Sequence, residues 1–251
     1  MSNDVPWREH HIHHDGSEAD EGADDFHLQL FAPPDDPFRT FEYSFPVTLA
    51  DGGGTSAVEC RLRGQEEHTS TGLALWSGSL MLARHLADHP DLVRGRRVLE
   101  LGAGMGLCGI VAHKLGCRDA SLTDGDAKVL DNLRYNVRTN VPPASSHGGS
   151  PISCPQLIWG QGLDEFMSQR FHGGERYDVI MASDVGYMTK SLDPLWRTID
   201  RCLEATGGGI FIYVGECSSQ DSVEHFLNVA RRFKFTWTVM PDEVYIFRRK
   251  M

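Results

Sequence analysis

The sequence has no run of about 18 apolar residues, no CxxC pair and no excess of basic residues. The missing apolar run excludes a membrane-spanning helix, because such a helix needs about 20 apolar residues. Six cysteines without paired spacing predict free thiols, and neither a zinc knuckle nor a disulfide framework. The first residues lack the features of a secretory signal and are too acidic for a mitochondrial transit peptide, so we expect a cytoplasmic or nuclear protein with no membrane partner.

Negative charge is concentrated at the start of the chain. The formal net charge is −11, and residues 1–25 hold eight acidic residues and one basic residue, which leaves −4 for the remainder. A dedicated nucleic-acid binder needs a basic surface to displace counterions, so the composition does not favour a nucleic-acid partner. The early histidines fix no coordination geometry in such a segment, and we expect no metal site there; they are His10, His11, His13 and His14.

The length of 251 residues fits one sizeable α/β domain with short additions. Residues 1–25 are polar and charged, and we expect a disordered tail. Residues 26–70 contain two partly alternating runs, 38–50 and 56–64, around a glycine-rich turn, which predicts a β-hairpin extension. Residues 71–251 should form the domain that carries the chemistry.

Strand and helix patterns alternate through this last segment. The first pattern is a broad apolar helical face over 71–89, followed by Pro90. The predicted strands are 96–101, 120–124, 156–159, 177–184 and 208–216, and the helices between and after them are 106–116, 126–140, 163–170, 192–205 and 222–233. Residues 141–155 are predicted to form an exposed insertion. Such alternation is typical of a mostly parallel sheet with helices on both faces.

The end of the chain departs from this alternation. The runs 233–240 and 244–250 are separated only by Pro-Asp-Glu, which leaves no room for a crossover helix, so these strands must be antiparallel. We therefore expect an α/β protein with a Rossmann-like seven-stranded sheet whose last strand is reversed, preceded by the N-terminal β-hairpin. This arrangement resembles the class I S-adenosylmethionine-dependent methyltransferases more than a plain dinucleotide-binding sheet.

A glycine-rich loop follows the first strand of this sheet. Gly102, Gly104 and Gly106 occupy alternate positions, which allows a sharp turn and a close approach of backbone to a ligand. Close packing of a strand-to-helix turn is the alternative explanation. Glu100 precedes the first glycine, and a carboxylate there would repel a pyrophosphate and tolerate an ammonium or a sulfonium.

An acid also follows the second strand. Asp124 lies 22 residues after Gly102, where a carboxylate can accept hydrogen bonds from a ribose diol. NAD and S-adenosylmethionine share that diol, so Asp124 indicates adenosine without distinguishing the two. An N-cap for the helix that starts near residue 126 is the alternative role, and Asp126 is a substitute candidate.

Several blocks together carry a more specific resemblance. They are "TGLALWSGSLMLARHL", "VLELGAGMGLCGI", "LTDGDAKVLDNLRYNV", "LIWG" and "YDVIMASDVGY". The segment 70–251 resembles the lysine-directed seven-strand protein methyltransferases, which include the calmodulin-lysine and elongation-factor-lysine enzymes. The resemblance implies S-adenosylmethionine as cofactor, no metal, and a lysine-bearing protein partner such as calmodulin, a chaperone or an elongation factor. It implies cofactor contacts from Trp76, Glu100, Gly102, Gly104, Gly106, Asp124, Trp159 and Ser183, and catalytic roles for Asp184 and Tyr187. Trp159 could equally be a core aromatic.

Asp184 and Tyr187 also have a case from position alone. Asp184 follows an apolar strand and should lie at the carboxyl edge of the sheet, facing the same crevice as the glycine loop. A carboxylate there can bind a lysine ammonium, and an aromatic wall favours the neutral amine needed for in-line displacement at the methyl carbon. A helix N-cap is the alternative for Asp184.

Other functions remain as alternatives. An NAD-dependent oxidoreductase fits the glycine loop and Asp124, but Glu100, the reversed final hairpin and the lack of a Ser/Tyr-x-x-x-Lys pair speak against it. A methyltransferase acting on a small molecule, on nucleic acid or on protein histidine would keep the same cofactor site. A non-catalytic protein that binds S-adenosylmethionine would keep it too.

Overall fold

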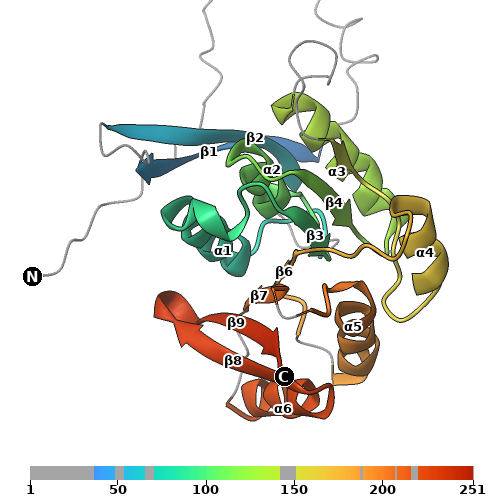
Figure 1. Cartoon of the computed structure of the whole chain (residues 1–251). Coiled ribbons are helices and arrows are strands. Elements are labelled where there is room, and N and C mark those ends of the chain that lie inside the picture. The colour runs from blue at the N-terminus through green and yellow to red at the C-terminus, as the bar shows by residue number, and fades with distance from the viewer. Residues whose placement is uncertain are drawn as a thin grey trace, which may run out of the picture.

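A seven-stranded sheet forms the centre of the molecule (Figure 1). The computed structural model describes residues 37–48, 54–65, 71–141, 151–186, 189–206, 208–215 and 220–250, and the tail predicted over 1–25 lies outside them. The strand order is β5-β4-β3-β6-β7-β9-β8. The strands are β3 (Arg97–Leu101), β4 (Asp119–Thr123), β5 (Ile152–Ser153), β6 (Val179–Ser183), β7 (Ile210–Val214), β8 (Phe235–Met240) and β9 (Val244–Arg249). As predicted, the last strand is reversed: β9 runs antiparallel to β7 and to β8.

The central strands are apolar on both faces because both faces are covered by helices. In β6, Val179 and Met181 join one core cluster, whereas Ile180 and Ala182 join the other. The same alternation of side chains runs through β3 and β7. This pattern is the one expected of a buried parallel sheet.

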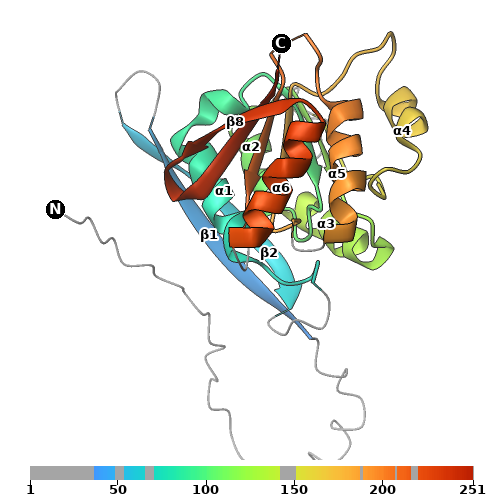
Figure 2. The same cartoon turned by 90° about the horizontal axis from the view of Figure 1, so that it is seen from below.

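Two helical layers enclose the sheet (Figures 1 and 2). The first contains α1 (Ser77–Asp88), α2 (Leu107–Lys114) and α3 (Ala127–Asn140), and the second contains α4 (Leu163–Arg170), α5 (Thr189–Cys202) and α6 (Gln220–Arg232). Short 3₁₀ turns occur at Pro90–Leu92 and Pro241–Glu243. Among the helices of the described ranges, none combines the length and apolar character needed to cross a membrane.

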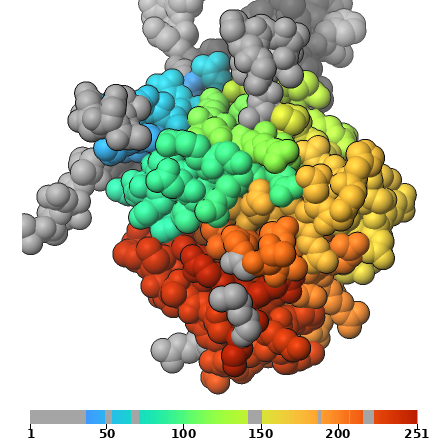
Figure 3. All heavy atoms as spheres, in the orientation of Figure 1, coloured from blue at the N-terminus to red at the C-terminus, as the bar shows by residue number. Residues whose placement is uncertain are grey.

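The N-terminal hairpin is confirmed and shares the core of the first layer. Strands β1 (Phe38–Thr48) and β2 (Thr55–Gln65) pair antiparallel, with Phe45 opposite Val58. The inward-facing residues are buried in the same cluster as residues of α1, α2 and α3; they are Phe45, Val47, Val58, Cys60 and Leu62. In the space-filling view the blue hairpin atoms lie against the green atoms of the layer that follows (Figure 3). The hairpin is therefore packed as part of the fold.

Two predicted elements are misplaced. The leading helix begins at Ser77 instead of residue 71, and Trp76 is its N-cap residue. The edge strand is Ile152–Ser153, inside the predicted insertion, and not 156–159, where Gln156 makes only an isolated bridge to Asp124. Leu157 is buried in the core cluster that contains Ile180 and Ala182, the second core cluster, and Trp159 packs against it. These residues are apolar because they pack against the core, and neither pairs as a strand.

Candidate active site

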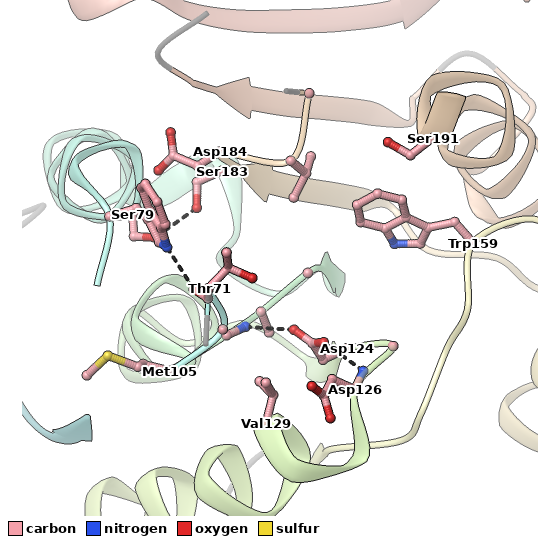
Figure 4. A pocket seen from close by; sticks show the side chains of 18 of the residues that line it. Thr71, Ser79, Met105, Asp124, Asp126, Val129, Trp159, Ser183, Asp184 and Ser191 are labelled. Atoms are coloured by element: carbon pink, nitrogen blue, oxygen red, sulfur yellow. Dashed lines mark hydrogen bonds between the residues drawn. The ribbon is translucent and has the colours of Figure 1, made fainter. Parts of the chain in front are cut away.

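A cavity of about 720 Å³ opens at the carboxyl ends of β3, β4 and β6. This size is in the range of small-molecule and cofactor sites, and the carboxyl edge is where open α/β sheets bind ligands. Its wall combines the glycine loop with residues before and within the first turn of α1, the ends of β4 and β6, the segment 157–159 and the start of α5. Figure 4 shows these side chains converging from both halves of the sheet.

The three predicted glycines all line this cavity between β3 and α2. Gly102 has φ of +68°, and a Cβ there would lie 2.8 Å from Val185 Cγ1 and 3.4 Å from Trp159 Cζ2. A Cβ on Gly104 would lie 3.3 Å from the carbonyl oxygen of Gly72. The absent side chains thus make room for protein atoms of the cavity wall, which supports close packing as a reason for these glycines. The close approach of a ligand stays a prediction.

Glu100 lies beneath the loop and is not part of the cavity wall. Its side chain is 3 % exposed, and its Oε2 accepts a hydrogen bond from the Gly109 backbone N–H at 2.9 Å. Burial raises the pKa of Glu100 to about 8, so the carboxyl is largely protonated at neutral pH. Glu100 is not among the residues that line the cavity, and its contact with the cofactor stays a prediction. Its side chain instead holds the start of α2 to β3.

Asp124 faces the cavity, and Asp126 takes the capping role (Figure 4). Asp124 accepts backbone hydrogen bonds from Gly104 to Oδ2 at 3.2 Å and from Asp126 to Oδ1 at 3.0 Å. Burial raises the pKa of Asp124. The side chain of Asp126 caps α3 by accepting a hydrogen bond from Lys128 N at 2.8 Å. The N-cap role considered for Asp124 is thus taken by Asp126.

Both predicted tryptophans line the cavity. Trp76 is 39 % exposed, and its indole N–H donates to the Thr71 carbonyl oxygen at 2.7 Å, which fixes the segment before α1. Trp159 borders the cavity while packing against the second core cluster. The packing supports the core-aromatic alternative, and the role of an adenine platform stays a prediction.

Ser183 and Asp184 lie at the end of β6, and both line the cavity. The hydroxyl groups of Ser183 and Ser79 are 2.9 Å apart and share a hydrogen bond. Asp184 has φ of +53°, and its backbone N–H donates to the Val214 carbonyl oxygen at 2.9 Å. Its carboxylate lies against the backbone of Gly78, in the first turn of α1, and α5 begins only at Thr189. Tyr187 lies outside the described residues.

The cavity also contains residues that the sequence did not indicate. Ser79 comes from α1, Tyr213 from β7, and Lys190 and Ser191 from the first turn of α5. Ser79 follows the Trp76 segment closely and could have been found from that spacing. Tyr213 is part of an apolar strand and gives no separate signal.

Comparison with known proteins agrees with this geometry. The model of the lysine methyltransferase family matches residues 58–233. The chain is 30 % identical to the protein N-terminal and lysine N-methyltransferase EFM7 of Cryptococcus neoformans, over 76 % of this chain and 64 % of that protein. It is 31 % identical to the mouse protein-lysine N-methyltransferase EEF2KMT, over 69 % of this chain and 53 % of that protein. The chain thus spans less than two thirds of these relatives' length.

Solved structures support the fold. The 16S rRNA N2 G1207 methyltransferase RsmC of T. thermophilus, solved with AdoMet and guanosine, superposes with a TM-score of 0.54 at 17 % identity, over 88 % of this chain and 53 % of that one. At this identity the similarity shows the Rossmann-like methyltransferase fold and nothing about the acceptor. The sheet order and the cavity are consistent with this fold. Because the family model matches most of the chain, the chain belongs to the lysine methyltransferase family.

Proposed function

We propose that this protein transfers a methyl group from S-adenosylmethionine to a lysine side chain of another protein. One observation carries the proposal: a single cavity joins the glycine loop and Asp124 to Ser183 and Asp184. The glycine loop and Asp124 suit an adenosine-containing cofactor, with Ser183 as a further proposed cofactor contact, and Asp184 suits a cationic acceptor. Membership of the lysine methyltransferase family supports the same assignment.

The residues present fit the cofactor. Asp124 accepts backbone N–H groups from Gly104, Gly125 and Asp126, and a carboxylate has about four lone-pair sites, which leaves capacity for a ribose hydroxyl. Gly102, Gly104 and Gly106 would expose backbone to the methionine portion, while Leu157 and Trp159 offer an apolar wall for the adenine. When bound, S-adenosylmethionine supplies an electrophilic methyl group on a cationic sulfonium.

Asp184 would hold the acceptor. Its carboxylate attracts an ammonium that the cationic cofactor would otherwise repel, and its fixed position orients the nitrogen. The apolar residues of the cavity wall would desolvate the amine and favour its neutral form, with the proton released to solvent. The neutral nitrogen would then bond to the methyl carbon as the bond from that carbon to sulfur breaks, and S-adenosylhomocysteine would leave. Alignment then contributes most of the acceleration, and no strong general base is required.

The acceptor amine has two sources. The names of the EFM7 relatives give both protein N-terminal and lysine methylation, and an α-amino group carries the same charge and the same lone pair as a lysine amine. We keep lysine as the proposal because the family model is that of the lysine methyltransferases.

The test is transfer of label from methyl-tritiated S-adenosylmethionine to a cell extract, followed by separation of protein, nucleic acid and metabolites. Hydrolysis of the labelled protein should give methyl-lysine. Label in N-terminal residues or in histidine would show that the methylated group is not a lysine side chain. Label only in RNA or metabolites would show that the substrate is not a protein. The Asp184→Asn variant should weaken the signal by about tenfold to a hundredfold, and Asp126→Asn, which preserves the α3 cap, should retain it.

A further inference from the structure

One face of α3 is bound to the backbone of the hairpin strand β2. Asn132, Asn136 and Asn140 lie four residues apart and therefore on one side of the helix. Asn140 accepts a hydrogen bond from Arg61 N at 2.8 Å and donates to Arg61 O at 2.6 Å. Asparagine side chains thus take the place of a neighbouring strand along this edge of β2.

Asn136 makes one contact that Asn140 lacks. It accepts from Arg63 N at 2.7 Å and donates to Arg63 O at 3.0 Å, and it also donates to the carbonyl oxygen of Met105 at 3.0 Å. Met105 belongs to the glycine loop and lines the cavity. Asn136 is fully buried, and its surroundings of two carbonyls and one N–H require two donors and one acceptor, which a carboxamide supplies.

The last residues of β2 touch both walls of the cavity. A Cβ on Gly64 would lie 2.6 Å from Met105 Sδ, so the Met105 side chain packs directly against this strand. Gln65 N donates to Leu73 O at 2.8 Å, which fixes the segment that runs from Thr71 to Trp76 along the cavity. The hairpin is therefore in contact with the glycine loop and with the segment facing it.

Three other hydrogen bonds of the loop are made to the ends of neighbouring strands or within the loop itself. Ala103 N donates to Thr123 O at 2.9 Å, Gly104 N to Asp124 Oδ2 at 3.2 Å and Gly106 N to Ala103 O at 2.7 Å. Glycines with positive φ have many alternative conformations, so such a loop depends on outside contacts to keep one of them. Asn136 thus adds a hydrogen-bonded link between this loop and the hairpin to the packing of Met105 against Gly64.

We propose that Asn136 is a positioning residue of the cofactor site, which holds the glycine loop in its binding conformation by joining Met105 to the hairpin strand β2. The identity of the cofactor rests on the proposed function, whereas the position of the loop does not. The hairpin is then part of the support of the cofactor site, although none of its described residues lines the cavity.

The test compares Asn136→Ala with Asn140→Ala in the full chain, using S-adenosylhomocysteine and titration calorimetry. Both variants lose hydrogen bonds to β2 and should lower the melting temperature. Only Asn136→Ala should weaken binding, by about tenfold, which corresponds to about 1.4 kcal/mol. Gly64→Ala, which displaces Met105 from the strand side, should weaken binding in the same direction. Equal weakening by Asn136→Ala and Asn140→Ala, or unchanged binding in Asn136→Ala, overturns the proposal.

Hydrogen exchange without ligand separates this proposal from the proposed function. The amides of 103–109 should exchange faster in Asn136→Ala than in Asn140→Ala. Failure of the wild-type protein to bind S-adenosylhomocysteine would refute the cofactor, and the exchange rates would still decide the role of Asn136. Equal rates in the two variants would overturn that role.

Discussion

The carboxylate of Asp184 lies directly against the backbone of Gly78, where a Cβ on residue 78 would come 2.5 Å from Oδ2. These residues are far apart in sequence, and they bring the end of β6 against the first turn of α1. Beside them, the hydroxyl groups of Ser79 and Ser183 join the same two elements. The position of the acid proposed to bind the acceptor therefore depends on the absence of a side chain in another element.

Replacing Gly78 with alanine should move the Asp184 carboxylate without changing any charge. An alanine within a helix normally stabilises it by up to about 1 kcal/mol relative to glycine, so a purely structural role predicts a higher melting temperature and normal turnover. We expect turnover to fall by about tenfold, which corresponds to about 1.4 kcal/mol, with unchanged S-adenosylhomocysteine affinity. Steady-state kinetics, calorimetry and thermal unfolding measure the three quantities.

The control for this prediction is the combined variant Gly78→Ala with Asp184→Asn. If Gly78 acts through Asp184, the double variant should lose little more than Asp184→Asn alone, because residues in contact are not additive. Full additivity of the two losses would show that Gly78 acts elsewhere.

Asp184→Asn should impair the acceptor step and leave the cofactor in place. The amide has nearly the same shape but no charge, and a hydrogen bond to a charged group contributes about 1.5–3 kcal/mol. We expect kcat/KM for the protein acceptor to fall by about tenfold to a hundredfold, since each 1.4 kcal/mol is about tenfold. Loss of S-adenosylhomocysteine binding with intact acceptor affinity would reverse the assignment.

The sequence predicts features that depend on neighbouring residues. The strand–glycine loop–helix unit, the N-terminal hairpin and the final reversed strand follow from apolar periodicity and short turns, and all three are confirmed. Asp124 was placed at the cavity because a strand end has a fixed location in this kind of sheet. Local sequence patterns are therefore sufficient to predict which residues lie at the carboxyl edge of the sheet, without knowledge of tertiary contacts.

Tertiary contacts account for the features that the sequence does not predict. Glu100 occupies the expected position in the chain, but its side chain turns under the loop to the Gly109 N–H, a choice that periodicity does not encode. The run 156–159 looks like a strand because its apolar residues pack against the core and the cavity. Gly78 and Asn136 gave no signal because their partners, Asp184 and Met105, are distant in sequence.

Asp124→Ala and Asp126→Ala should separate cofactor binding from helix capping. Asp124 lines the cavity and supports Gly104, so its loss should weaken S-adenosylhomocysteine binding by about tenfold to a hundredfold, the equivalent of about 1.5–3 kcal/mol. Loss of the Asp126 cap should cost about 1 kcal/mol of stability. Calorimetry and thermal unfolding distinguish the two effects, and a stronger loss of affinity in Asp126→Ala would exchange the two roles.

The buried Glu100 should make the stability of the protein pH-dependent. Its pKa is about 8 in the folded protein against 4.5 for an ordinary glutamate, and burial is the main cause. Between these values the folded state keeps a proton that the unfolded state has released, so the free energy of unfolding falls as pH rises through this window, by up to about 1.4 kcal/mol per pH unit for this group. Above the folded pKa the loss levels off.

Glu100→Gln removes this contribution, because a carboxamide stays neutral and its oxygen can still accept from Gly109 N. Measured without ligand, the difference in melting temperature between Glu100→Gln and the wild type should increase steadily from about pH 5 to about pH 8. In this window unfolding of the wild type releases the Glu100 proton, whereas the variant has no such proton to release. The exposed Glu224→Gln on α6 is the control and should follow the wild-type profile. Parallel profiles for Glu100→Gln and the wild type would show that the Glu100 carboxyl is ionised in the folded protein, which would restore the negative charge beneath the glycine loop that the sequence first suggested.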